Sequence, residues 1–316
     1  MIDSLPFTPV LWLSLIPAVP TLLIVFRDIP LLHAVIAVVL LWILKGVVQK
    51  LLGIPKITDL ERRAVFITGC DTGFGRLLTL KCLKAGMPVF AGCVTEQGAQ
   101  SLRDDAKGLR GRLDTIIVDV SNDESVHKAA EYLEKTTEQY GGLHAVVNNA
   151  GIVGSSYLDD LLTTNDYRKV VEVNTFGVIR VTHAVKHLVK KARGRVVAVA
   201  SVFGRLGLFG TGPYTISKFA VNAYCDVIRQ ELALFGVSVH ILEPGFFRTH
   251  LIDKGNTQGC MDEMWKNAPE KAKEEYGEEY FMESRGQIVE FLYNIGSDRV
   301  DLVVDAYFHA VTARLS

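Results

Sequence analysis

A tyrosine and a lysine, Tyr214 and Lys218, have the residue types and the spacing that acid–base chemistry requires. Side chains four residues apart on a helix lie on the same face, one turn from each other. A free phenol has a pKa of about 10, and an ammonium group about 4–6 Å away favours the phenolate by 1–3 pKa units. Ser201, upstream at the end of an apolar run, would add a hydroxyl group. The same spacing is common on solvated helices, so the interpretation depends on what the rest of the chain provides.

A glycine-rich turn at residues 68–75 lies between a short β-branched run and a helical stretch. Glycines let the backbone approach a pyrophosphate closely, and a helix N-terminus offers amide donors and a favourable dipole. The spacing differs from the general Gly-x-Gly-x-x-Gly fingerprint, so a turn without a ligand is the alternative. Residues 148–151, Asn-Asn-Ala-Gly, end a later apolar run, at the sheet edge where parallel folds bind ligands. Together the two stretches predict a dinucleotide site.

The order and spacing of these motifs resemble the short-chain dehydrogenase/reductase family over residues 60–315. The matching motifs are Thr68-Gly-x-x-x-Gly-x-Gly75, Asn148-Asn-Ala-Gly151, Asn174, Ser201, Tyr214-x-x-x-Lys218 and Pro244-Gly245. Within the family the chain is similar to membrane-associated retinol and hydroxysteroid (17-beta type) dehydrogenases, whose first turn resembles Gly-Cys-Asp-x-Gly-Phe-Gly. The resemblance implies an oxidoreductase that moves a hydride between a nicotinamide cofactor and an alcohol or carbonyl group.

The resemblance also implies a role for each matched residue. Tyr214 would be the acid/base, Lys218 would lower its pKa and hold the ribose, and Ser201 would bind the substrate oxygen. Asn174 would hold a water of a proton relay, Asp119 would contact adenine and Thr249 the carboxamide. The predicted catalytic residues are Asn174, Ser201, Tyr214 and Lys218, and the predicted cofactor contacts are Thr68, Gly69, Asp71, Gly73, Phe74, Gly75, Asp119, Val120, Asn148, Ala150, Gly151, Tyr214, Lys218, Pro244, Gly245 and Thr249.

Some of these residues admit a second interpretation from the sequence alone. Asp119 suits the N-cap of the following helix, and Asn174 suits a kink or a solvated position within a helix. Pro244-Gly245 is also a plain strand-ending turn.

The segments that follow the site strands are apolar, at residues 202–209 and 246–247, with Arg205 and Arg248 as neighbouring charges. Such walls favour a lipophilic substrate of the retinoid or steroid class, although phenylalanines of an ordinary core give the same pattern. The predicted substrate contacts are Ser201, Phe203, Leu206, Phe246 and Phe247.

The end of the second predicted strand favours NAD over NADP. It has the sequence Cys-Val-Thr-Glu at residues 93–96, without the arginine or lysine that binds a ribose 2′-phosphate, and Asp71 adds a negative charge. Arg76 is the residue that could reach this place and reverse the preference.

Strand and helix patterns alternate from residue 64 to residue 242. Apolar runs at 64–68, 89–94, 113–119, 144–147, 196–200 and 237–242 are separated by helical stretches at 76–85, 97–107, 123–140, 166–191 and 214–235. Strands that are continuously apolar and separated by helices are typical of a parallel sheet covered on both faces. We therefore predict an α/β fold with one doubly wound, Rossmann-type sheet over residues 56–316.

The composition excludes several other functions. With 34 basic and 35 acidic residues, the chain has no electrostatic case for nucleic-acid binding. Its five cysteines are an odd number and lie mostly within predicted elements, which is typical of reduced thiols. His183 and His187 lack the glutamate and the third ligand of a zinc motif, so no metal is expected.

The first 55 residues contain two uncharged apolar runs, at 10–26 and 29–44, each near the lower limit of about 17–25 residues for a spanning helix. A signal peptide needs a basic start, and the only early charge is Asp3. We predict a membrane anchor of one or two spans, with buried core helices as the alternative. Basic residues follow the second run, so we expect a cytosolic catalytic domain at the endoplasmic reticulum membrane.

Beyond Thr249 the pattern loosens into polar helices, and we predict that residues 250–316 form a lid over the substrate. Related chains usually continue with a seventh strand and an apolar tail, whereas this one stops at Ser316. That difference motivates an alternative function, a membrane-tethered binding protein with little or no turnover. The resemblance further implies a homodimer in which the helices of Asn174 and Tyr214 meet their symmetry mates.

Overall fold

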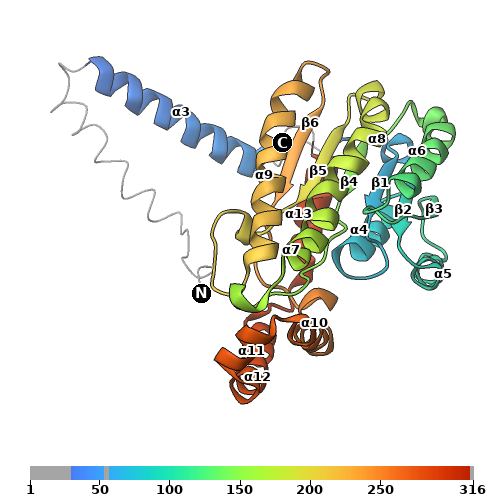
Figure 1. Ribbon diagram of the computed structural model, residues 1–316. Helices are drawn as coiled ribbons and strands as arrows, with labels where there is room; N and C mark the ends of the chain where they lie inside the picture. Colours follow the sequence, from blue (N-terminus) through green and yellow to red (C-terminus); the bar gives the residue numbers. More distant parts are fainter. Residues whose placement is uncertain (1–29, 53–56, 314–316) are drawn as a thin grey trace. The chain divides into compact units, whose positions relative to one another are not determined.

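The computed structural model describes residues 30–52 and 57–313, which fall into two compact units (Figure 1). One unit contains helix α3 (Pro30–Leu52), and the other contains residues 57–313. The prediction for residues 10–26 lies outside the described residues.

A six-stranded sheet forms the centre of the larger unit, in the order β3-β2-β1-β4-β5-β6, with every pair parallel. This is the doubly wound order, so the predicted α/β fold class is confirmed. Each strand lies within two residues of its predicted bounds because a strand buried on both faces is a continuous apolar run. The strands are β1 (Val65–Thr68), β2 (Val89–Cys93), β3 (Leu113–Ile117), β4 (Ala145–Asn148), β5 (Arg195–Val199) and β6 (Ser238–Leu242).

Helices cover both faces of the sheet, and two apolar cores result. One core contains α6 (Asp123–Thr137), α8 (Gly177–Lys191) and α9 (Gly212–Ala233), and the other contains α4 (Gly73–Lys84), α5 (Glu96–Asp105) and α13 (Val300–Thr312). Successive strand residues alternate between the two cores, as Val65 and Phe66 illustrate. Side-chain caps start two of these helices: Thr95 accepts from the Gly98 amide and Asn122 from the Ser125 amide.

The single helix predicted over residues 166–191 is wrong in one respect. The chain forms α7 (Thr164–Val171), then a π-helical turn (Glu172–Phe176), and only then α8. A π-helical turn adds one residue to a helical turn and shifts the side chains that follow it. This turn carries Asn174.

The predicted lid region divides into two parts. Helices α10 (Lys254–Asn267), α11 (Glu270–Tyr276) and α12 (Glu278–Ile295) share a third apolar core with Tyr157 and Leu161 of the segment after β4. Helix α13 instead packs against α4 and the sheet (Figure 1). The lid proposal is therefore kept for α10–α12.

Helix α3 exposes large apolar side chains over its described positions, among them Val38, Leu41 and Trp42, which is 75% exposed. Within the described part of the chain, no helix has both the length and the apolar character that crossing a membrane requires.

Two buried basic side chains hold the C-terminal end of α13. Arg195 Nη1 donates to the carbonyl oxygens of Ala310 (2.8 Å) and Ala313 (2.9 Å), and His144 Nε2 lies 2.9 Å from the carbonyl oxygen of Val311. The last carbonyls of a helix have no partner within the helix, so these contacts satisfy them inside the core. Burial lowers the pKa of His144 to about 4.

The neutral His144 predicts a loss of stability in mild acid. Below the ordinary histidine pKa of 6.5, His144 binds a proton in the unfolded chain but not in the folded chain. The contribution of neutral His144 to the free energy of unfolding is therefore complete above pH 6.5 and is lost as the pH falls toward 4. Chemical denaturation in detergent at pH 7 and pH 4.5 should show the wild type losing roughly 2 kcal/mol more than His144→Gln. His127 is exposed, so His127→Gln is the control, and its free energy of unfolding should fall between the two pH values as much as that of the wild type. Parallel pH dependences of wild type and His144→Gln would contradict the prediction.

Candidate active site

The turn between β1 and α4 requires glycine at three positions, because of a positive φ angle or a lack of space. Gly69 and Gly73 have positive φ angles of 70° and 61°. A Cβ atom on Gly75 would lie 2.5 Å from Asn149 Nδ2 and closer still to the carbonyl oxygen of Gly69. Thr72, at the N-cap of α4, makes no side-chain capping bond, so the first amides of α4 remain available as donors. This arrangement fits the pyrophosphate of a dinucleotide.

Hydrogen bonds join this turn to the end of β4. Thr68 Oγ1 accepts from the amides of Asn149 and Ala150, both at 3.1 Å. Asn149 Nδ2 donates to the carbonyl oxygens of Thr68 (2.9 Å) and Gly69 (3.1 Å). We did not single out Asn149 from the sequence, although it lies within the motif that we identified. The next residues, Ala150 and Gly151, are thereby held beside the turn.

Three predicted cofactor contacts also have structural partners. Asp71 accepts from the amides of Val94 (2.8 Å) and Thr95 (3.0 Å), so it holds the segment after β2 beside the first turn. Asp119 accepts from the amide and hydroxyl of Ser121, and the cap of α6 is Asn122, so the N-cap interpretation of Asp119 is wrong. Asn148 Nδ2 donates to Thr182 Oγ1 at 2.9 Å.

Asn174 faces inward because of the π-helical turn. Its side chain is fully buried, accepts from the Ile152 amide (2.8 Å) and donates to Ile152 O (2.8 Å) and Ser217 Oγ (3.0 Å). It therefore joins the segment after β4 to α9. A Cβ atom on Gly151 would lie 3.1 Å from Asn174 Oδ1 and 3.6 Å from Lys218 Nζ, so these two predicted catalytic residues meet at Gly151.

Ser201, Tyr214 and Lys218 lie together at the carboxyl end of β5. Lys218 is buried, and its Nζ donates to Val199 O at 2.9 Å and lies 5.4 Å from the centroid of the Tyr214 ring. The Ser201 hydroxyl lies close enough to Tyr214 to lower the pKa of its phenol, against the larger effect of burial. Ser201 is buried and also contacts Pro244 O at 3.3 Å.

The aromatic residues predicted as substrate contacts lie in different directions. Phe203 packs edge-on against Tyr214 and Phe246, with ring centroids 5.9 Å and 5.5 Å apart. Phe247 instead packs against Phe74 of the first turn, at 5.9 Å. Leu206 is 44% exposed beyond Phe203.

The segment after β6 reaches the first turn. A Cβ atom on Gly73 would lie 3.9 Å from Thr249 Cβ, whereas one on Gly245 would meet nothing within 4 Å. The carboxyl ends of β1, β4, β5 and β6 therefore bring the catalytic set and the glycine turn to one edge of the sheet, the usual ligand edge of such folds.

Residues 63–259 match the model of the short chain dehydrogenase family. The chain belongs to this family. It is an NAD(P)-dependent oxidoreductase that acts on CH–OH groups.

Several curated dehydrogenases are similar to this family member. Human short-chain dehydrogenase/reductase family 9C member 7 is 41% identical over 259 residues, which are 82% of this chain and 80% of the relative. Retinol dehydrogenase 7 of Rattus norvegicus is 41% identical over 81% and 79% of the two chains, and human 17-beta-hydroxysteroid dehydrogenase type 6 is 40% identical over the same shares. The solved structure of ElxO with NADP bound has a TM-score of 0.55 and 25% identity over 60% of this chain and 75% of that chain.

Burial shifts the pKa values of the short-chain dehydrogenase's acid–base pair toward the neutral forms. The pKa of Tyr214 is raised to about 12, mainly by burial and against the hydrogen bond from Ser201. The pKa of Lys218 is lowered to about 8 by burial. We expected Lys218 to lower the pKa of Tyr214, but desolvation is the larger effect here. A neutral phenol is the form that can donate a proton, and a phenolate is the form that can accept one.

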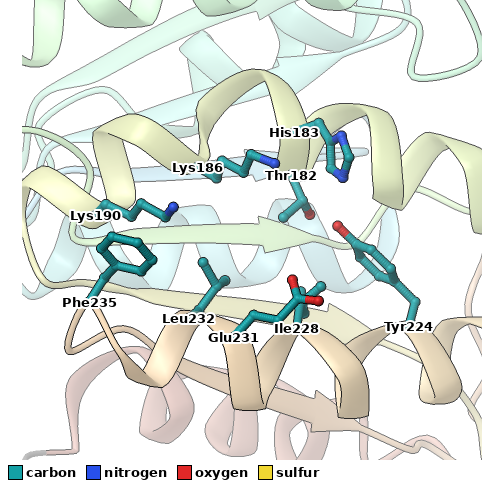
Figure 2. Close-up of a pocket in the computed structure, with 9 residues that line it drawn as sticks. All are labelled: Thr182, His183, Lys186, Lys190, Tyr224, Ile228, Glu231, Leu232 and Phe235. Atoms are coloured by element: carbon teal, nitrogen blue, oxygen red, sulfur yellow. The ribbon is translucent and has the colours of Figure 1, made fainter.

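One cavity lies apart from this edge, between α8 and α9 (Figure 2). It has a volume of about 140 Å³, and Lys186, Lys190 and Glu231 line it together with Tyr224 and Phe235. None of the predicted site residues lines it.

Tyr214→Phe tests the acid–base assignment. The ring packing against Phe203 is kept while the proton carrier is lost, so kcat should fall at least about 100-fold with a small change in KM. In the wild type, kcat/KM for alcohol oxidation should rise by up to tenfold per pH unit because the phenol must ionise, and the variant should lose this dependence. Steady-state kinetics between pH 6 and pH 10 measure both. A variant with more than a tenth of the wild-type kcat would refute the role of Tyr214.

Proposed function

We propose that this short-chain dehydrogenase interconverts a secondary or allylic alcohol and its carbonyl on a lipophilic substrate of the retinoid or steroid class. The observation that carries the proposal is the aromatic wall beside the acid–base group: Phe203 contacts both Tyr214 and Phe246. An apolar substrate would bury surface there at about 25 cal/mol per Å². Relatives named retinol and 17-beta-hydroxysteroid dehydrogenases support the same class.

In the proposed mechanism the bound nicotinamide supplies or accepts the hydride. Tyr214 donates its proton to the carbonyl oxygen during reduction and takes the hydroxyl proton during oxidation. Ser201 hydrogen-bonds the same oxygen and stabilises the charge that develops on it. Lys218 and Asn174 would return the proton to solvent through a water, and their proximity at Gly151 supports this role.

The lid would close the site with helices α10–α12. Tyr157, which follows β4, packs edge-on against Phe281 of α12 with ring centroids 6.0 Å apart. A Cβ atom on Gly210 would lie 3.7 Å from Tyr157 Cα, so this aromatic pair adjoins the apolar loop before α9. Exclusion of water by such a lid strengthens every electrostatic interaction inside the site.

A panel of alcohols tests the substrate class. With absorbance of the reduced nicotinamide as the signal, kcat/KM should be at least about 100-fold higher for retinoid or hydroxysteroid alcohols than for small charged hydroxy acids, because burial of apolar surface is worth several kcal/mol. Phe246→Ala should raise KM for the lipophilic alcohol about tenfold or more. Phe247→Ala is the matched control. It should raise KM for the cofactor instead of KM for the alcohol, since the Phe247 ring packs against Phe74 of the first turn. A clear preference for hydroxy acids would reject the assignment.

We propose NAD as the cofactor. The arginine that could have reached a 2′-phosphate is engaged elsewhere: Arg76 binds Asp105 and donates to Ser101 Oγ at 2.9 Å. Arg103, on α5, pairs with Glu96. The Asp71 carboxylate lies beside the Val94 and Thr95 amides, where a second negative charge would be repelled.

Titration with the two reduced cofactors tests this preference. NADH should bind at least about tenfold more tightly than NADPH, and Val94→Arg should reduce that ratio about tenfold by placing a cation at the end of β2. Val94 is 56% exposed, so the substitution leaves the core unchanged. Tighter binding of NADPH by the wild type would reverse the proposal.

We also propose a homodimer formed through α9. Ile216, Phe219, Val227 and Leu234 follow each other at helical spacing and are all exposed, Leu234 at 86%. An apolar stripe on the outer face of a surface helix is expected to be covered. Tyr224, Ile228 and Glu231 of the same helix line the cavity of Figure 2, which a second copy packed on α9 would cover.

Membrane attachment through residues 1–55 is the last part of the proposal, with the catalytic domain on the cytosolic side of the endoplasmic reticulum. The support is α3, which forms a unit of its own and exposes apolar side chains all round. A helix that is apolar on every side has to bury that surface in lipid or in protein.

Deletion of residues 1–55 tests attachment and dimerisation together. The full chain should pellet with membranes after a high-salt wash, and the shortened chain should stay in the supernatant as a dimer by light scattering.

Val227→Arg in the shortened chain should give a monomer, because it places a charge within the apolar stripe of α9. Val94→Arg, at a similarly exposed valine outside the stripe, is the matched control and should remain dimeric. A shortened chain that still pellets would require a second attachment site, and a monomeric one would refute the dimer.

A further inference from the structure

Tyr307 of α13 contacts the glycine turn between β1 and α4, from which it is far in the sequence, and also contacts the end of β4. The side chain is completely buried. Its hydroxyl donates to Asn149 Oδ1 at 2.9 Å, and its ring lies 6.4 Å from that of Phe74 at an angle of 49°. Phe74 is part of the turn itself, and Asn149 touches the turn from the end of β4.

The Tyr307 hydroxyl completes the hydrogen bonding of the Asn149 amide. Asn149 Nδ2 uses its two hydrogens on the carbonyl oxygens of Thr68 and Gly69, which leaves Oδ1 to accept from Tyr307. The amide also lies where Gly75 has no side chain, since a Cβ atom there would be 2.5 Å from Nδ2. Loss of the hydroxyl would leave the acceptor of the half-buried Asn149 side chain without a protein partner, and rotation of the amide would release Gly69.

Helix α13 is anchored independently of this contact. Lys81 of α4 forms an ion pair with Asp305, and Arg195 holds the carbonyl oxygens of Ala310 and Ala313 at the other end. The Tyr307 hydroxyl is therefore presented from a helix that other contacts already position. It acts on the turn and is not needed to dock α13.

We propose that Tyr307 is a positioning residue for the nicotinamide cofactor: through Asn149 and Phe74 it holds the β1–α4 turn in the conformation that receives the pyrophosphate. The proposal rests on the family's use of a nicotinamide cofactor and is independent of the substrate class. Tyr307 acts through Asn149 and Phe74.

Tyr307→Phe in the full-length protein is the direct test, since it keeps the ring beside Phe74 and removes only the hydroxyl. The dissociation constant for NADH, measured by fluorescence titration without substrate, should rise about tenfold, while kcat at saturating cofactor should stay within about twofold. Amide hydrogen exchange should accelerate at residues 69–76 and 149–151 and remain unchanged along α13.

Thr312→Val is the matched control. Thr312 is also a buried hydroxyl of α13, but its bond goes to Phe308 O at 2.7 Å and does not reach the turn. It should lower stability without changing the dissociation constant for NADH. The proposal is overturned if Tyr307→Phe binds NADH within twofold of the wild type, if Thr312→Val weakens NADH equally, or if Tyr307→Phe fails to fold, because the hydroxyl would then serve the core. A wild type that binds neither NADH nor NADPH would instead refute the cofactor assignment.

Discussion

The hydrogen-bonded junction between the carboxyl ends of β1 and β4 is the constraint on which the site depends. Thr68 Oγ1, at the end of β1, accepts hydrogen bonds from the amides of Asn149 and Ala150 after β4. The Asn149 side chain in turn donates two hydrogen bonds to the carbonyl oxygens of Thr68 and Gly69. The parallel register that pairs Ile67 with Val147 brings both strand ends to the same level. A slip of one residue would turn each strand's side chains to the opposite face and separate the glycine turn from Gly151.

Desolvation shifts the pKa values of Tyr214 and Lys218 in opposite directions. Burial raises the pKa of Tyr214 to about 12 and lowers that of Lys218 to about 8, so both groups are biased toward neutrality. A low dielectric also strengthens hydrogen bonds to developing charge, which is the role that we propose for the Ser201 hydroxyl. Burial therefore makes both the phenolate of Tyr214 and the ammonium of Lys218 harder to form.

The segment after Thr249 contributes to the site in two ways. Helices α10–α12 have their own apolar core, which they share with Tyr157 and Leu161 of the segment after β4. Helix α13 is part of the sheet's covering layer, and its end is capped by Arg195 and His144 from inside the core. The lid and the cofactor support that we propose therefore lie on different helices of this C-terminal segment.

The sequence by itself determined the strands and the doubly wound, parallel class of the sheet, because strands buried on both faces are continuous apolar runs. It also determined the glycines of the first turn, because positive φ angles at Gly69 and Gly73 favour glycine. It could not determine what depends on distant contacts. The π-helical turn that buries Asn174, the opposite directions of Phe246 and Phe247, and the bond from Tyr307 to Asn149 across 158 residues arise only when the elements pack. The raised pKa of Tyr214 belongs to the same group, since helix spacing predicts a neighbouring ammonium but not the loss of water around the phenol.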